Sequence, residues 1–114
     1  MKALVYEEYC KKTAEGAPDD DFQKILQVKE IDDPKPKPDE VVFKVKAAAL
    51  NYNDIWGMRG EPVPVPLPHV SGSDAAGDVI AVGDEVLNIK VGDRVVSHSN
   101  MSCRVCEACT DGRE

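Results

Sequence analysis

Alternation of apolar and polar residues predicts a β-hairpin at the start of the chain. Residues 2–7 read Lys-Ala-Leu-Val-Tyr-Glu, a short opening strand, and residues 25–31 alternate over their second half as a returning strand. The polar residues 11–21 between them end in three consecutive aspartates, which is typical of a hairpin tip. Residues 32–40 contain three prolines, which remove backbone donors, so we expect an extended connector there.

Three further strands are predicted after the connector. Residues 41–50 (VVFKVKAAAL) give the best strand pattern in the sequence, and residues 76–82 and 91–96 give two shorter ones. Proline alternates with aliphatic residues over 61–68, which indicates a rigid crossing loop rather than a ladder strand. Short strands separated by Gly-Asp and proline turns predict a mainly β barrel or sandwich.

One short helix is expected between the strand at 41–50 and the crossing loop. Asn51 or Asn53 can cap its N-terminus, and Asp54 lies in its first turn, where a carboxylate is favoured. Gly57 and Gly60 limit its length.

Composition narrows the classes of protein that remain. A chain of 114 residues, 42% of them hydrophobic, provides one domain with one core. Aspartate and glutamate outnumber lysine and arginine by 21 to 14, giving a net charge of −7, which disfavours nucleic acid and anionic membrane surfaces as partners. Because no signal segment and no apolar run of ~18 residues is present, we expect a cytoplasmic protein.

A cysteine cluster is the most specific chemical signal. Cys103, Cys106 and Cys109 follow one another at a spacing of three, which suits thiolate ligands wrapped around one zinc ion. Structural zinc usually takes four protein ligands, so one donor is missing. Two other interpretations stay open: a redox-active pair formed by Cys103 and Cys106, and unrelated reduced thiols. The fourth ligand could be a thiol beyond the end of this sequence or one of three residues: Cys10, His98 or Asp111.

Five motifs in a fixed order resemble one family. They are PKPKPDEV, AALNYNDIW, PHVSGSDAAG, VGDRV and the cysteine run, which together extend over most of the chain. This order is similar to the N-terminal, GroES-like domain of medium-chain dehydrogenases/reductases, the superfamily of zinc-type alcohol dehydrogenases and quinone oxidoreductases. The resemblance implies a mainly β, GroES-like, partly open barrel with one short helix over residues 1–99. It also implies that a cysteine-rich structural zinc lobe begins at residues 100–114.

The resemblance further implies that this chain is part of a larger enzyme. Family members carry a Rossmann domain that binds NAD(P)H after the GroES-like domain, and no G-x-G-x-x-G motif occurs here. We therefore expect an N-terminal fragment, inactive alone, of an oxidoreductase about three times as long. The fourth cysteine of the family's zinc lobe would lie just past residue 114. The intact enzyme is expected to be a homo-oligomer that acts on a small-molecule carbonyl or activated-alkene substrate.

The family's catalytic zinc ligands have no counterpart in this chain. Zinc-dependent members have cysteine where this sequence has Asn51, and Gly-His-Glu where it has Gly72, Ser73 and Asp74. Neutral amide and hydroxyl donors hold zinc poorly, so the resemblance implies a reductase without catalytic zinc. Residues 51–56 and 69–77 also resemble crotonyl-CoA carboxylase/reductase sequences, which points to an enoyl thioester.

Four residues of the implied cleft are candidate catalytic residues, each with a structural alternative. Asn51 is expected to contact the substrate or the nicotinamide amide, or simply to cap the helix. Tyr52 can donate a proton or pack in the cleft, and Asp54 resembles an acidic residue near the cofactor but also suits a helix start. Ser73 can relay a proton or stabilise a turn.

Two functions outside the oxidoreductase class fit the same sequence. A stand-alone zinc-bearing β-barrel could serve as a binding or assembly module, because a GroES-like fold does not by itself imply catalysis. A thiol redox protein that uses Cys103 and Cys106 would instead form a labile disulfide and bind no metal.

Overall fold

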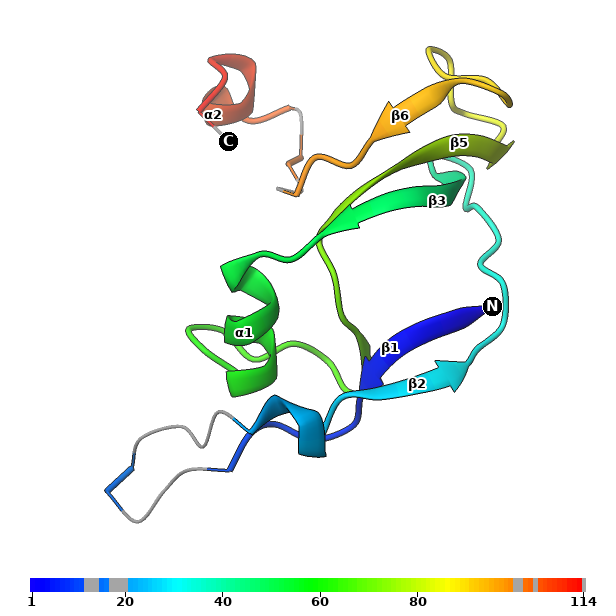
Figure 1. The fold of residues 1–114 in the computed structure, drawn as a ribbon. Coiled ribbons are helices and arrows are strands. Elements are labelled where there is room, and N and C mark those ends of the chain that lie inside the picture. The colour runs from blue at the N-terminus through cyan, green and yellow to red at the C-terminus, as the bar shows by residue number, and fades with distance from the viewer. Residues whose placement is uncertain (12–14, 17–20, 100–101, 104, 114) are drawn as a thin grey trace.

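Two three-stranded antiparallel sheets form the body of the molecule (Figure 1). The computed structural model describes residues 1–11, 15–16, 21–99, 102–103 and 105–113. One sheet has the order β2-β1-β4 and the other β3-β5-β6. The strands are β1 (Lys2–Tyr6), β2 (Gln27–Glu30), β3 (Val41–Ala49), β4 (His69–Val70), β5 (Asp74–Val82) and β6 (Arg94–Val96). The helices are α1 (Tyr52–Arg59), α2 (Glu107–Thr110) and the 3-10 turn η1 (Phe22–Lys24).

The predicted N-terminal hairpin is confirmed, with a shorter second strand. β1 and β2 pair antiparallel, with Leu4 opposite Val28, but β2 begins at Gln27 rather than at residue 25. Ile25 instead follows η1 and is buried, because its side chain joins the core beside Tyr6. Packing of Ile25 in the core thus makes the strand begin two residues later than predicted. Most of the predicted hairpin tip at 11–21 lies outside the described residues.

The β3–β5 pair carries the long strand predicted at 41–50. Its register shifts between Val42 and Phe43 and again between Val45 and Ala47, so strict alternation fails along β3. Gly77 on β5 is required by close packing, because a Cβ there would lie 2.1 Å from the carbonyl oxygen of Lys44. β6 begins at Arg94, three residues later than predicted, since residues 91–92 form a turn.

A small core lies where α1 meets the first sheet. Tyr6, Ile25 and Met58 are buried together. A Cβ at Gly57 would lie only 2.7 Å from the Tyr6 hydroxyl, so the glycine inside α1 makes room for this tyrosine. The helix continues past Gly57 and ends at Gly60, whose φ of 69° is left-handed. Partly buried residues complete this core: Tyr9, Cys10, Phe22, Leu26 and Val65.

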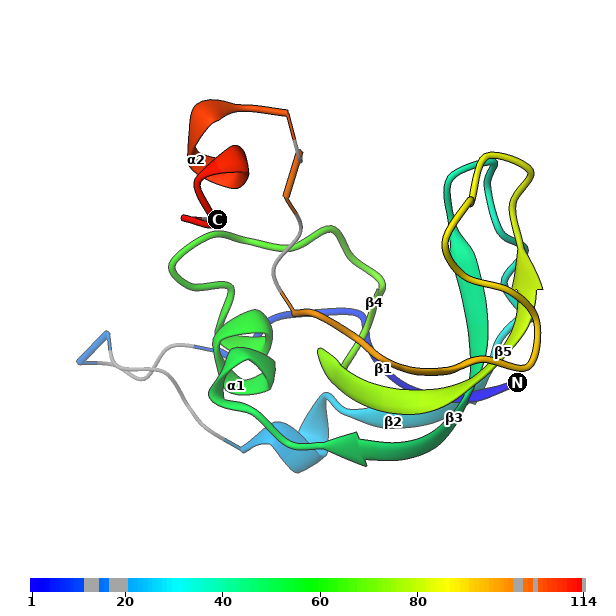
Figure 2. The same ribbon diagram turned by 90° about the horizontal axis from the view of Figure 1, so that it is seen from above.

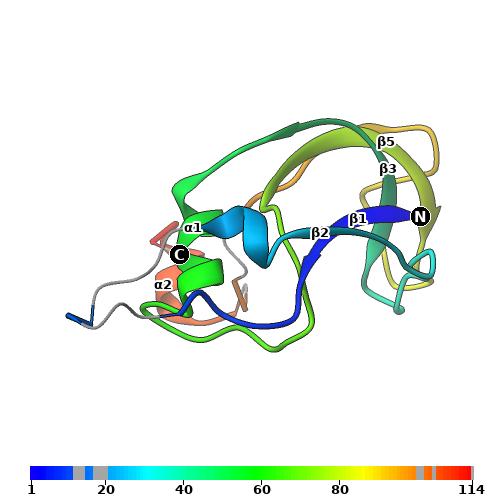
Figure 3. The ribbon, with the colours of Figure 1, turned by 60° about the horizontal axis from the view of Figure 1, so that its bottom comes forward.

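Figures 2 and 3 show α1 at one end of the two sheets, and Figure 2 shows α2 separated from α1. The radius of gyration of 16.5 Å exceeds the ~13 Å of a compact domain of this length. The predicted mainly β, partly open architecture is confirmed. None of the helices among the described residues could cross a bilayer.

Candidate functional site: a capped helix and a thiol cluster

The N-terminus of α1 is capped by Asn51. Its backbone is extended, with φ of −132° and ψ of 158°, and its side-chain oxygen accepts a hydrogen bond from the Asn53 amide at 3.4 Å. The Asp54 carboxylate accepts in return from the Asn51 amide at 2.9 Å, which completes a capping box. The structural alternatives for Asn51 and Asp54 are therefore present in the fold, because both side chains satisfy backbone donors at the helix start.

Asn51 also reaches across to the second sheet. Its side-chain nitrogen donates a 2.7 Å hydrogen bond to a carboxylate oxygen of Asp74, at the start of β5. Asp74 pairs with Ala49 in the β3–β5 ladder, so the contact joins the helix start to both long strands. These bonds leave one N–H of the Asn51 amide without a partner among the described residues, and that group can donate to a carbonyl oxygen.

Ser73 lies beside this contact and has a buried hydroxyl. Its Oγ makes no hydrogen bond to any described residue, which is uncommon for a buried polar atom. Its carbonyl oxygen accepts from the Ser97 hydroxyl at 2.9 Å, and the same Ser97 oxygen accepts from the Ala75 amide at 2.9 Å. Ser97 thus braces the start of β5 and holds the Ser73 backbone in place.

Tyr52 is exposed on the first turn of α1. Its ring meets that of Trp56 edge-on, with centroids 5.3 Å apart and an interplanar angle of 79°. The Arg59 guanidinium donates a long 3.5 Å hydrogen bond to its hydroxyl. Tyr52 is 53% exposed and does not join the Asn51–Asp74 contact, so the hydroxyl is open to solvent. Trp56 also lines an open hollow with Glu61 and Pro62.

Three residues predicted from the sequence, Asn51, Asp54 and Ser73, lie around the start of α1 and of β5. Asp74 was not predicted as a site residue, although the family motif at 72–74 pointed to that position. Ser97 was missed altogether. Its position depends on the pairing of β5 with β6, and no local pattern in the sequence reports that register.

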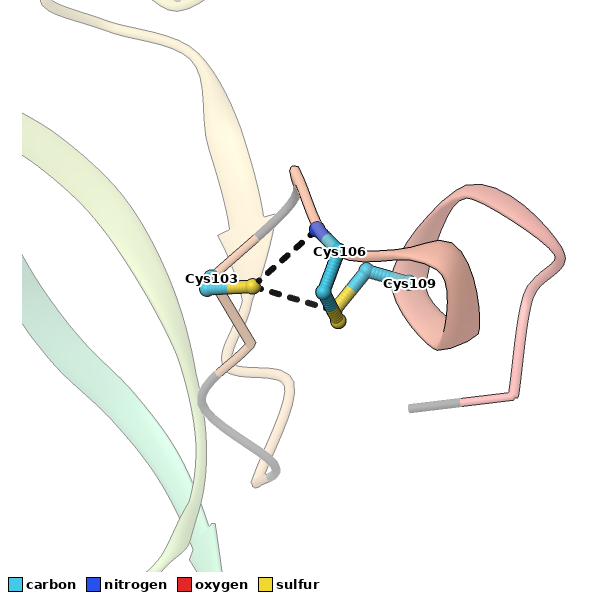
Figure 4. A group of neighbouring side chains, drawn as sticks. All are labelled: Cys103, Cys106 and Cys109. Carbon is cyan, nitrogen blue, oxygen red and sulfur yellow. Dashed lines mark hydrogen bonds between the residues drawn. The ribbon is translucent and has the colours of Figure 1, made fainter.

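The three clustered cysteines converge in the second part of the site (Figure 4). Cys103 precedes α2, Cys106 is its N-cap and Cys109 lies within it, so one turn of helix brings the last two side chains together. All three sulfurs lie within 4.8 Å of one another. The Cys103–Cys109 and Cys106–Cys109 sulfur distances are 3.7 and 3.3 Å, close to the ~3.8 Å edge of a tetrahedral zinc–thiolate site.

The local backbone favours ionisation of one thiol in this cluster. Backbone N–H groups of Val105 and Cys106 point at the Cys103 sulfur and, with the neighbouring thiols, lower its pKa from 9 to about 7. A thiolate is the form that binds zinc.

None of the three residues proposed as a fourth ligand joins the thiols within the described residues. Within the part of the chain that the structure describes, the metal-binding group contains no atom of Cys10, His98 or Asp111. The Asp111 carboxylate instead accepts from the Arg113 guanidinium at 2.7 Å. The observed donor set is therefore three sulfurs.

Known proteins with the same architecture identify the fold. The alcohol dehydrogenase GroES-like domain family matches residues 37–114. The crotonyl-CoA carboxylase/reductase of Cereibacter sphaeroides is 41% identical over 103 residues, covering 85% of this chain and 23% of that enzyme. Among solved structures, an NAD-dependent alcohol dehydrogenase superposes with a TM-score of 0.80 at 38% identity, covering 99% of this chain and 30% of that one.

A second solved structure represents the branch that reduces quinones. The Escherichia coli quinone oxidoreductase, solved with NADPH, has a TM-score of 0.66 at 30% identity, covering 84% of this chain and 26% of that one. The chain spans about a quarter of the length of its curated relatives. The predicted GroES-like fold and the family resemblance are confirmed. The chain belongs to the alcohol dehydrogenase GroES-like domain family, the N-terminal domain of the medium-chain oxidoreductases.

Proposed function

We propose that this chain is the substrate-side domain of an NAD(P)H-dependent reductase that works without catalytic zinc. The substrate is a small-molecule carbonyl or an activated alkene, and the relatives named for coenzyme A thioesters favour an enoyl thioester. A further domain of the intact, homo-oligomeric enzyme supplies the nicotinamide cofactor. Residues 1–114 alone then have no turnover, because the hydride donor is missing.

The hydrogen bond from Asn51 to Asp74 carries this proposal. In zinc-dependent relatives the positions of Asn51, Ser73 and Asp74 hold Cys, His and Glu. Here the Asn51 oxygen caps α1 and its nitrogen donates to Asp74, so the amide and the carboxylate are already engaged with each other. Zinc requires free thiolate, imidazole or carboxylate donors, and this set does not fit it.

The remaining amide N–H gives Asn51 a role in such a reaction. Donation to the carbonyl oxygen of the substrate would polarise it, and the 2.7 Å contact with Asp74 would keep the amide in that orientation. The buried Ser73 hydroxyl has no partner among the described residues and is the second group able to exchange a hydrogen bond with a bound molecule. Tyr52 remains a candidate proton donor, and Asp54 acts through the helix cap.

A structural zinc ion at the thiol cluster is part of the proposal. Cys103, Cys106 and Cys109 supply three ligands, and a donor outside the described residues completes the site. Such an ion would supply no chemistry to the reduction. It would hold residues 103–109 in one arrangement, which a four-residue helix without buried residues does not achieve alone.

The proposal is tested first on the protein as its source makes it. Affinity capture with an antibody against residues 1–114, followed by denaturing mass spectrometry, should give a polypeptide near three times 12.4 kDa. That polypeptide should oxidise NADPH or NADH with enoyl thioesters or quinones, and purified residues 1–114 should not. A natural polypeptide near 12.4 kDa would contradict the proposal and favour the stand-alone binding module.

The absence of catalytic zinc has its own test on this chain. The double variant Asn51→Cys/Ser73→His restores thiolate and imidazole beside Asp74, so it should bind one more zinc ion than the parent chain. Metal content by mass spectrometry measures the difference, and Tyr52→Cys/Ser73→His serves as a control with the same residue types in the wrong place. A parent chain that already holds a second zinc ion, lost in Asn51→Ala, would contradict the zinc-free site.

A further inference from the structure

We propose a phosphate-binding site on the β3–β5–β6 sheet, formed by a cation cluster that consists of Lys44, Lys46 and Arg94. The inference is independent of the proposed reductase function. The three strands lie side by side in the upper half of Figure 1. The cations come from β3 and β6, the two strands that pair with β5 on either side of Asp78. The ligand class is a small molecule that carries a phosphate or diphosphate group.

Strand register brings the cations to one face. Asp78 is directly opposite Lys44 on one side and Arg94 on the other, and directly paired residues share a face of a sheet. The β3 bulge near Val45 brings Lys46 to the same face, where its ammonium lies 3.6 Å from the Asp78 carboxylate. Backbone pairing therefore fixes the main chain of Lys44 and Arg94, and the β3 bulge carries Lys46 between two paired residues.

One carboxylate cannot neutralise three cations. Asp78 is shared, with contacts of 3.6 Å to Lys46 and 3.8 Å to Arg94. Several other ion pairs in this chain are tighter, such as Lys29–Glu7 at 2.6 Å and Lys90–Asp93 at 2.8 Å. Within the described residues no carboxylate pairs with Lys44. The cluster therefore keeps about two units of positive charge on a chain whose net charge is −7.

Two of the three cations, Lys46 and Arg94, line an open hollow with a floor of small residues. The hollow measures about 390 Å³ and is lined by Lys46, Arg94 and Asp78 over Ala76 and Gly77. Its volume is in the range of small-molecule sites, which is ~300–1,000 Å³. The absence of large side chains on the floor lets an anion approach between Lys46 and Arg94. Guanidinium and ammonium groups together suit phosphate oxygens, because one gives a planar fork and the other a compact charge.

The first test is a titration of the 15N-labelled chain with inorganic phosphate at constant ionic strength. We expect amide shifts confined to residues 44–46, 76–78 and 94–96, and saturable binding. Arg94→Gln and Lys46→Gln should each weaken binding at least fivefold. Lys37→Gln is the control, because it removes one exposed cation that pairs with Glu40 away from the hollow, and should change binding less than twofold.

The variant Asp78→Asn distinguishes a phosphate-binding site from a set of ion pairs that only stabilises the sheet. Removing the competing carboxylate should tighten phosphate binding at least threefold, whereas Asp39→Asn, with the same charge change on the connector, should not. Thermal unfolding of every variant checks that the sheet is intact. If Arg94→Gln is destabilised, the phosphate affinity of Lys46→Gln alone tests the site. Equal weakening in Lys37→Gln, or shifts spread over the whole chain, would overturn the site.

A titration with a second ligand, pyrophosphate, distinguishes a diphosphate ligand from a phosphate monoester. Pyrophosphate that binds at least fivefold tighter than inorganic phosphate, with the same dependence on Arg94, would support the site and assign a diphosphate ligand. Equal affinity of the two would support the site and assign a phosphate monoester. Pyrophosphate binding that Arg94→Gln and Lys46→Gln both leave unchanged would overturn it.

Discussion

The site at the start of α1 and β5, called the barrel site below, and the cluster of three cysteines are stabilised in opposite ways. Asn51, Asp54 and Asp74 are fixed by a capped helix and a long strand pair, and each makes a direct hydrogen bond within the fold. Cys103 and Cys106 are exposed and lie just before α2, a four-residue helix without buried residues. Geometry in the barrel therefore comes from backbone pairing, whereas geometry in the lobe depends on what the sulfurs bind. Substitutions that weaken the support of one region should therefore leave the other region unchanged.

The largest expected effect is the loss of metal from the lobe. The double variant Cys103→Ser/Cys106→Ser should lower zinc from about one ion per chain to none, and amide signals of residues 105–113 should collapse to random-coil positions. Signals from β1 to β5 should stay in place, because their hydrogen bonds do not involve the lobe. Metal analysis and 15N spectra measure both. Unfolding of the whole chain on zinc removal would show that the two regions are coupled.

A substitution in the β3–β5 pair should instead destabilise the sheets and leave the thiol cluster unchanged. Gly77→Ala places a Cβ 2.1 Å from the Lys44 carbonyl oxygen, so the β3–β5 pair must shift, at a cost of about 3 kcal/mol in the free energy of unfolding. Gly112→Ala is the matched change in the lobe: its φ of 69° disfavours alanine, but no atom lies within 4 Å. It should leave the urea midpoint of the barrel unchanged. An unchanged midpoint in Gly77→Ala would contradict the close packing.

Asn51 allows a smaller test of the support for the barrel site. Asn51→Ala removes the helix cap and the contact with Asp74, which should cost about 1–2 kcal/mol. Asn51→Ser keeps a capping hydroxyl and loses only the reach to Asp74, so it should recover about half of that. Urea unfolding gives both values. Equal losses in the two variants would mean that the cap contributes nothing.

The smallest effect is a shift in the titration of one thiol. Hydrogen bonds from backbone amides stabilise the Cys103 thiolate, so its pKa of about 7 lies below the ordinary 9. In the zinc-free chain, alkylation of Cys103 by iodoacetamide should rise with pH to half its maximum near pH 7 and be lost below it. Peptide mass spectrometry at a series of pH values follows the reaction. A midpoint near pH 9 would show that α2 does not hold these amides in place without metal.

Much of the fold could be predicted because its signals are local. The extended connector, the strand at 41–50 and the helix cap at Asn51 each depend on residues within a few positions of one another. The sequence also located the thiol cluster, because a spacing of three brings side chains together on one short turn. Predictions that failed depend on distant partners: Ile25 leaves its strand to pack beside Tyr6, and β6 starts only at Arg94, where its pairing with β5 begins.

The sequence by itself determined the residue types at the barrel site, including the amide at Asn51 and the hydroxyl at Ser73. Only the tertiary structure decided that Asn51 bonds Asp74, that Ser97 braces Ser73, and that Lys46 and Arg94 share Asp78 on one sheet face. The physical reason is register. The residues in these contacts are distant in the sequence and meet because β3, β5 and β6 pair, and two register shifts in the β3–β5 pair set which side chains lie together.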